Sequence, residues 1–256
     1  MGAGMICTIC QEEIPAGRNQ CVDPYTNPEG VHCGSRACVL ACEACQEWIG
    51  VVVAGAPKVP KEEEETPRDF PMEDVTPEMI EEARKRRVED DKLFGPGSRT
   101  MKDLHGERWV GPLVEDRFKR WAGEKVHDNR RNKLDAYDFR VHELFLDVKG
   151  QPVKGKPRVE YGFSIHESHV VAKRFSTAFV FVWYGEFAGT KGGPATFLLG
   201  WLPKLEFMRG AVYLREGERY PAVGNVQGQI VKANCYNIRI FKIWPIETML
   251  LGAVKV

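Results

Sequence analysis

Two aspartates and a lysine interrupt a strand-like apolar stretch in the middle of the chain. The stretch LDAYDFRVHELFLDVKG, residues 134–150, carries Asp138, Asp147 and Lys149 where valine or isoleucine would be ordinary. Burying an unpaired charge costs free energy, so these side chains are expected to pair with each other or with a ligand. Two close carboxylates repel unless a divalent cation lies between them, and their oxygen atoms suit Mg²⁺ or Mn²⁺.

A β-hairpin would bring these three charged side chains together. Because strand side chains alternate between faces, Asp147 and Lys149 share one face of their strand. A tight turn at His142 and Glu143 would pair this strand with the preceding one. Asp138 would then lie within reach of Asp147 across the pair. A cation held there would lower the pKa of a water molecule, and the lysine would orient that water or neutralise the charge developing on a phosphoryl group.

An ordinary ion pair is the alternative interpretation of the same hairpin. Asp138 could pair across the strands with Lys149 or Arg140. Charged residues on an exposed face of a sheet need no metal, so the hairpin alone does not distinguish the two interpretations.

The surrounding sequence predicts the elements that would position this hairpin. Residues 76–97 predict an exposed helix, with Thr76 as its N-cap, Pro77 in its first turn and GPG at its end. Its RKRR run is interpreted as a solvated helix face. From about residue 100 the chain predicts a compact α+β domain, beginning with a helix whose apolar residues recur at helical spacing: Trp109, Leu113, Val114, Phe118 and Trp121. Strands are predicted in AYDFRV, ELFLDVK, TAFVFVWYGEF, TFLLGWL and YNIRIFKIW.

The hairpin and its surroundings resemble the core of the PD-(D/E)xK nuclease superfamily. The run YDFRV-x3-FLDVKG matches its hairpin, which supplies an Asp and then D/E-x-K, with Asp147 at the position where Glu is commoner. GPLVEDRF matches the family's G-x3-E turn on the preceding helix, at Gly111 and Glu115. AFVFVWYGEF and FLLGWLPKLEF resemble its later strands, including a GW-x-P/S-x2-E step. The likeness covers roughly residues 100–215, with a final strand near 236–245.

The resemblance implies a fold, a reaction and a set of site residues. The fold would be an α+β restriction-endonuclease-like core, with a mixed central sheet flanked by helices. The reaction would be divalent-metal-dependent hydrolysis of phosphodiester bonds, with DNA as the expected nucleic acid. Asp138 and Asp147 would ligate Mg²⁺ or Mn²⁺, Glu115 would help to hold the metal, and Lys149 would position or activate water. Other helical acids compete with Glu115 for its role: Glu107, Asp116 and Glu124. The segment before the next strand places Lys173 and Arg174 where family members contact substrate, so these two are expected to meet phosphates.

A separate group of thiols lies near the N-terminus. Seven of the eight cysteines fall within the first 45 residues, and with one histidine they make eight candidate zinc ligands: Cys7, Cys10, Cys21, His32, Cys33, Cys38, Cys42 and Cys45. Zinc takes four ligands, so eight would fill two closed structural Zn²⁺ sites, and the metal would supply the folding energy that so short a segment lacks. The pairing of ligands stays open between a CxxC–CxxC site beside a second site and a cross-braced arrangement. The module loosely resembles treble-clef and RING-like modules, but its ligand order argues against a ubiquitin-system role.

Composition bounds the remaining possibilities. Lys plus Arg and Asp plus Glu both number 36, so net charge does not indicate nucleic acid, although a local basic surface can still exist. No apolar run approaches the roughly 20 residues of a membrane helix, and no signal peptide is recognised, so a cytoplasmic protein with no membrane partner is expected. The layout of a zinc module joined to a nuclease-like domain suits a DNA-processing enzyme of a bacterial or phage-infected cell. We divide the chain into a zinc module (1–50), an acidic linker with an exposed helix (51–97) and a nuclease-like domain (98–256).

Two functions follow from this division. In the first, the chain is a metal-dependent nuclease whose zinc module docks nucleic acid or a protein partner. In the alternative, the chain is a non-catalytic zinc adaptor that binds nucleic acid or protein on an inactive nuclease-like scaffold.

Overall fold

The structure, a computed structural model, describes most of the chain after residue 67. The described residues are 68–94, 109–130, 137–172, 176–220 and 229–250, together with the backbone of four two-residue strands near the N-terminus. Those strands pair antiparallel as β1 with β2 and β3 with β4; their bounds are Met5–Ile6, Glu13–Ile14, Cys21–Val22 and Val31–His32. The fold is a mixed α+β fold, with a curled mixed sheet flanked by helices, as the sequence predicts.

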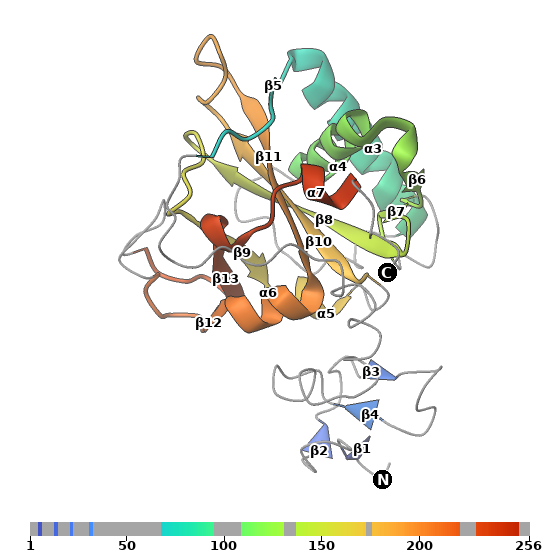
Figure 1. Ribbon diagram of the computed structural model, residues 1–256, viewed down its shortest axis with the longest axis vertical. Helices are drawn as coiled ribbons and strands as arrows, with labels where there is room; N and C mark the ends of the chain where they lie inside the picture. Colours follow the sequence, from blue (N-terminus) through green and yellow to red (C-terminus); the bar gives the residue numbers. More distant parts are fainter. Residues whose placement is uncertain are drawn as a thin grey trace.

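A six-stranded sheet forms the centre of the described domain (Figure 1). Its strand order is β5-β11-β10-β8-β7-β6, in which β8 and β10 are parallel and every other neighbouring pair is antiparallel. The bounds are Met72–Asp74 for β5, His127–Asp128 for β6, Phe139–Val141 for β7, Leu144–Val153 for β8, Ala178–Gly185 for β10 and Ala195–Pro203 for β11. The strands β7, β8, β10 and β11 coincide with four of the predicted runs.

The two central strands explain why the sheet is covered on both faces. Every residue of β10 and of β11 is buried, which is the pattern of a continuous apolar run packed on both sides. On one face, a Cβ built at Gly150 of β8 would lie 2.8 Å from Val114 of the helix α4 (Val110–Ala122), so α4 covers this face. On the other face, Phe179 and Phe181 pack against Phe207, with ring centroids 5.1 and 5.9 Å away.

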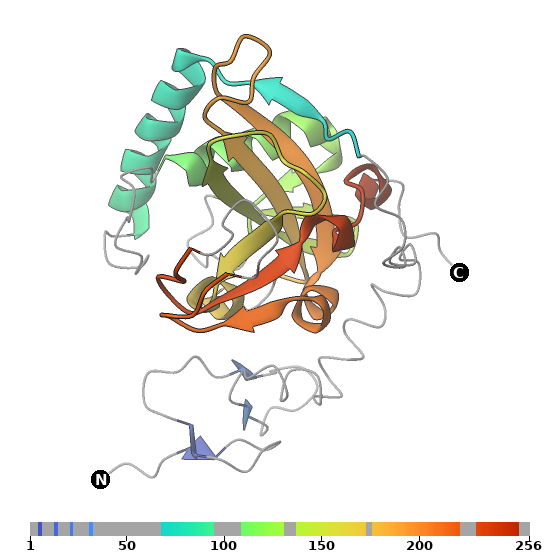
Figure 2. The ribbon, with the colours of Figure 1, turned by 90° about the vertical axis from the view of Figure 1, so that its left-hand side faces the viewer.

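A second layer covers the face that carries Phe179 and Phe181. It is a three-stranded antiparallel sheet of order β12-β13-β9, accompanied by short helices, and it lies apart from α3 and α4 (Figures 1 and 2). The elements of this layer are β9 (Gly162–His166), α5 (Glu167–Ala172), α6 (Lys204–Gly210), β12 (Val212–Leu214) and β13 (Cys235–Arg239). The short helix α7 (Glu247–Leu250) is bonded to β11, since Trp201 Nε1 donates to Thr248 Oγ1 at 2.9 Å. A 3₁₀ turn at Gly123–Lys125 directly follows α4, and another at Ile240–Lys242 follows β13. The predicted final strand corresponds to β13, which lies in this smaller sheet.

The segment expected to be a linker and exposed helix is, where described, part of the folded domain. Strand β5 pairs with β11 at the edge of the central sheet. The helix α3 (Pro77–Phe94) begins as predicted, with Thr76 Oγ1 accepting a hydrogen bond from Met79 N at 3.3 Å. It packs beside α4 (Figure 1), and Ala83 on its inner side is 1% exposed. The RKRR run is likewise only partly solvated, because Arg87 is buried.

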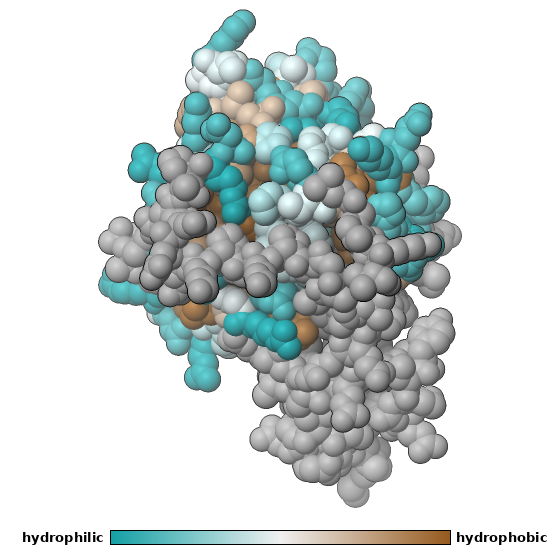
Figure 3. All heavy atoms as spheres, in the orientation of Figure 1, coloured by the Kyte–Doolittle hydropathy of each residue, from teal (hydrophilic) through white to brown (hydrophobic). Residues whose placement is uncertain are grey.

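The described surface carries few large apolar side chains. On the face seen in Figure 3, the coloured surface is mostly hydrophilic, with scattered hydrophobic residues. The exposed large hydrophobic residues of the described chain are Met72, Val88, Phe187, Val212 and Ile230, which come from separate elements and turns. Within the described ranges, no helix combines the length and the apolar character needed to cross a bilayer.

Candidate active site

The predicted hairpin is confirmed. Strands β7 and β8 pair antiparallel with Val141 opposite Leu144 and Arg140 opposite Phe145, so His142 and Glu143 form the two-residue turn. His142 has φ 50°, a left-handed conformation that is uncommon for a side chain other than glycine but ordinary in tight hairpin turns.

Asp138 is anchored to β8 on both sides of Asp147. Its backbone N–H donates to Leu146 O at 2.8 Å, and its Oδ2 accepts from Val148 N at 2.8 Å. The carboxylate therefore takes the place of a backbone acceptor directly before β7 begins. These two bonds reach the chain neighbours of Asp147, so Asp138 lies beside it along the hairpin. Both aspartates are buried, with 4% and 1% exposure.

Lys149 forms an ion pair with Asp147 along the same strand. Lys149 Nζ lies 2.7 Å from Asp147 Oδ2, and its side chain is 12% exposed. Residues two apart in a strand face the same way, so the pair follows from strand geometry. The chain itself therefore compensates part of the buried charge, since the Asp147 carboxylate lies against the partly buried ammonium of Lys149.

The site lies on the sheet face opposite α4. Asp147 is in register with Phe179 of the parallel neighbour β10, and Phe179 is fully buried on the face covered by α6. Lys149 Nζ lies 5.8 Å from the centroid of the Phe179 ring, and Lys204 Nζ lies 5.3 Å from the same centroid. Two lysines therefore extend over one aromatic ring beside Asp147.

Glu115 is not brought to this site. It lies on α4, which covers the other face of the sheet, and its Oε2 forms an ion pair with Arg86 Nη2 of α3 and lies 4.0 Å from Arg130 Nη1. The resemblance implied that Glu115 shares a metal with Asp138 and Asp147, but the sheet itself separates them here. The spacing of a G-x3-E turn gives the position of Glu115 along its helix, whereas the packing of α3 against α4 decides which side chain Glu115 pairs with.

Glu115 belongs instead to an ion-pair network that joins α3, α4 and β6. Arg130 contacts Asp116 at 2.5 Å and Asp128 at 2.7 Å, and Lys119 contacts Asp128 at 2.7 Å. Burial raises the pKa of Asp128, but hydrogen bonds from Arg130 and Lys119 outweigh this effect and hold that pKa below its ordinary value of 3.8. Asp116, which the sequence offered as an alternative to Glu115 for holding the metal, is thus also part of this network.

The other predicted ligands are placed only in part. Among the residues that the structure describes, no group of three or more His, Cys, Asp or Glu side chains is arranged to hold a metal ion. Lys173 and Arg174 lie outside the described residues, as does Glu107. Of the eight expected zinc ligands, only the backbone of Cys21 and His32 is described, and these two are cross-strand partners in the β3–β4 pair.

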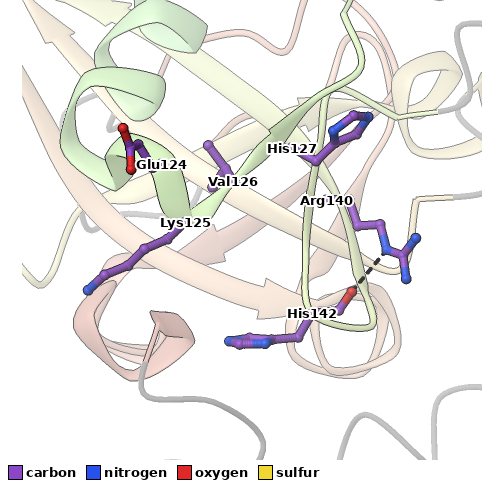
Figure 4. Close-up of a pocket in the computed structure, with 6 residues that line it drawn as sticks. All are labelled: Glu124, Lys125, Val126, His127, Arg140 and His142. Carbon is purple, nitrogen blue, oxygen red and sulfur yellow. Dashed lines mark hydrogen bonds between the residues drawn. The ribbon is translucent and has the colours of Figure 1, made fainter.

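A pocket of about 480 Å³ lies at the other end of the hairpin, away from Asp147. It is lined by Glu124, Lys125, Val126, His127, Arg140 and His142. Figure 4 shows these side chains spreading outward rather than converging, and Arg140 Nε donates to His142 O at 3.0 Å. The pocket therefore contains none of Asp138, Asp147 and Lys149, and Glu124 is the one helical acid considered beside Glu115 that lines it.

Comparisons with models of protein families, with curated proteins and with solved structures give no match for the chain. Two residues at the site escaped the sequence reasoning, Phe179 and Lys204. Phe179 lies in a continuous apolar run that marks it only as a core residue, and Lys204 occupies an unspecified position of the GW-x-P/S-x2-E step. The signal for Lys204 was its position directly after the proline that ends a buried strand.

Proposed function

We propose that the described domain is a divalent-metal-dependent nuclease of restriction-endonuclease-like fold that hydrolyses phosphodiester bonds of DNA. The observation that carries the proposal is the cluster of two buried aspartates and Lys149 on a hairpin of the expected geometry. Such a cluster on a mixed sheet flanked by helices supports the sequence resemblance, and Glu115 is left out of the site because it lies across the sheet.

The donor set fits a magnesium or manganese ion. Mg²⁺ keeps several waters and is commonly held by one or two carboxylates together with substrate phosphates, so Asp138 and Asp147 would suffice as protein ligands. Their oxygen atoms are the hard donors that this ion prefers. When bound, the ion supplies Lewis-acid chemistry, since it polarises a phosphoryl oxygen and lowers the pKa of water.

The chain's own residues orient the reacting groups. Asp147 holds the Lys149 ammonium 2.7 Å from its Oδ2, so the positive charge is fixed before substrate binds. An ammonium in that position neutralises the negative charge that develops on the phosphoryl group, and a charge that is preorganised in a buried site costs little reorganisation during the reaction. The backbone bond from Val148 N fixes the Asp138 carboxylate in the same way.

The test is cleavage of plasmid and single-stranded DNA in Mg²⁺ or Mn²⁺. We expect wild-type cleavage to fall by about 10²- to 10³-fold in Lys149→Met and in Asp147→Asn, by analogy with the removal of one electrostatic contact from an active site. Asp69→Asn and Lys191→Ala serve as matched controls, because both residues are exposed. Circular dichroism of each variant separates loss of chemistry from loss of fold. Equal and negligible cleavage by wild type and Lys149→Met under both metals would remove the proposal.

A second function is favoured by the Asp147–Lys149 ion pair itself. A direct contact at 2.7 Å can neutralise both charges without any metal, as in a scaffold that only binds. A non-catalytic protein of this kind would bind DNA equally well with and without Mg²⁺, and Asp138→Asn would leave its binding unchanged. DNA binding measured at matched ionic strength with and without Mg²⁺ distinguishes it from the nuclease.

We further propose that residues 1–50 form a module holding two structural Zn²⁺ ions, which docks nucleic acid or a protein partner. The cross-strand pairing of Cys21 with His32 supports a shared ion for these two, because directly opposite residues of an antiparallel pair face the same way. Elemental analysis of the full chain is expected to give about two zinc ions per molecule. A Cys21→Ser variant that keeps the wild-type zinc content would contradict this ligand assignment.

A further inference from the structure

We propose that Lys204 is a second phosphate-contacting lysine of the active site, acting with Lys149 on the same phosphate group of the nucleic-acid backbone. This inference rests on the proposed function and extends it to a residue that the motif does not include. Lys149 and Lys204 come from elements on either side of β10, and both extend over the Phe179 ring.

The backbone places Lys204 at the end of the sheet near Asp147, two residues beyond Leu202, which is level with Asp147 across Phe179. Ala178 of β10 is in register with Leu146 of β8 and with Pro203 of β11. Pro203 ends β11, and Lys204 N donates to Thr177 O at 2.8 Å, one residue before β10 begins. The first residue of α6 is therefore fixed at the same end of the sheet as the hairpin carboxylates.

Thr177, directly before β10, fixes the position of Lys204 by hydrogen bonds to β8 and to the start of α6. Its N–H donates to Phe145 O at 2.7 Å, its Oγ1 accepts from Phe145 N at 2.9 Å, and its carbonyl accepts from Lys204. Thr177 is 4% exposed, so these bonds lie in a region that excludes water. The backbone of Lys204 is thus tied directly to Thr177 and, through Thr177, to β8.

The chemistry of the two ammonium groups suits a bridging anion. Both approach a fully buried aromatic ring, in a site where water screens charge less than at the surface. A metal on the Asp138–Asp147 side and two ammonium groups on the Phe179 side would surround a phosphoryl group with positive charge. Ligand recognition would be through the phosphate, so binding should depend little on base sequence.

The experiment measures how DNA binding depends on salt. A fluorescent single-stranded oligonucleotide is titrated with the full-length protein in the absence of added divalent cation, at several NaCl concentrations, and binding is followed by anisotropy. Removing one lysine–phosphate contact should lower the slope of log K against log salt by about 1 and weaken binding by about tenfold near physiological salt. We expect this for Lys204→Ala, wild-type behaviour for Lys191→Ala, and a preserved slope for Lys204→Arg, which keeps the charge.

Parallel cleavage assays in Mg²⁺ separate this inference from the proposed function. Wild-type cleavage with an unchanged slope in Lys204→Ala overturns the inference and leaves the nuclease standing. A reduced slope without any wild-type cleavage keeps Lys204 as a phosphate contact and removes the nuclease. If Lys204→Ala lowers the melting temperature while the slope stays at the wild-type value, Lys204 only balances the charge of the aspartates, and the inference fails.

Discussion

Replacing Lys149 by methionine should destabilise the folded domain strongly, because it leaves the Asp147 carboxylate buried without its ammonium. The two charged atoms lie 2.7 Å apart, and the side chains of Asp147 and Lys149 are 1% and 12% exposed. At an effective dielectric constant of about 20, their Coulomb attraction is about 6 kcal/mol before desolvation is counted. Removing one partner of a buried pair costs about 3 to 5 kcal/mol, and the exposed fraction of Lys149 places the expectation at about 3 kcal/mol.

The measurement is urea unfolding of the full chain followed by tryptophan fluorescence, for which the fully buried Trp183 is a reporter. Four proteins form a double-mutant cycle: wild type, Lys149→Met, Asp147→Asn and the double variant. Because the double variant buries neither charge, we expect it to recover to within about 1 kcal/mol of wild type. The coupling energy between the two sites should then be about 2 kcal/mol or more.

Lys191→Ala provides the reference for an exposed lysine in a turn. If Lys149→Met and Lys191→Ala change the free energy of unfolding by the same amount to within about 0.5 kcal/mol, the ion pair contributes nothing and the reasoning from burial is refuted. Strict additivity of the two site variants would refute it equally, because it would mean that the carboxylate and the ammonium do not interact.

Three other predictions test the site and the fold around it. Mg²⁺ at about ten times its dissociation constant should raise the free energy of unfolding by about 1.4 kcal/mol in wild type and by less in Asp147→Asn, in the same urea assay. Gly200→Ala should destabilise by about 3 kcal/mol, because Gly200 has φ 141° and a Cβ there would overlap the carbonyl oxygen of Trp244, whereas Gly193→Ala, with open space around it, should cost nothing measurable. The contribution of Asp128, whose pKa is lower in the folded state than its ordinary 3.8, is fully present above that pH and is lost as the pH falls below it, so the stability difference between wild type and Asp128→Asn should shrink on acidification.

Local patterns in the sequence were sufficient to predict the hairpin and the two long helices α3 and α4. Alternation along residues 137–149 predicted both strands and their turn, because the period of a strand is fixed by its backbone. The helical spacing of apolar residues predicted α4, and Thr76 and Pro77 predicted the start of α3. Each of these features depends on interactions within a few residues, which a single sequence displays directly.

Long-range pairing could not be read in the same way. Strand β5 lies more than 100 residues before β11 in the chain, yet the two strands pair at the edge of the central sheet. Strands β9 and β13 pair with each other in a separate sheet. The sequence indicates that these segments are extended strands, but the packing of the layers decides which strands pair with one another. For the same reason, the described part of the expected linker proved to be part of the domain.

The sequence by itself determined that Asp147 and Lys149 pair along one strand and that the hairpin carries Asp138 beside that strand, since one turn and one strand period fix these positions. Only the tertiary structure decided the rest of the site. It placed Glu115 on the far side of the sheet with Arg86, and it carried Lys204 over the ring of Phe179. The physical reason is that a strand fixes the relative faces of its own side chains, whereas the face that a distant helix covers depends on which packing arrangement buries the most apolar surface.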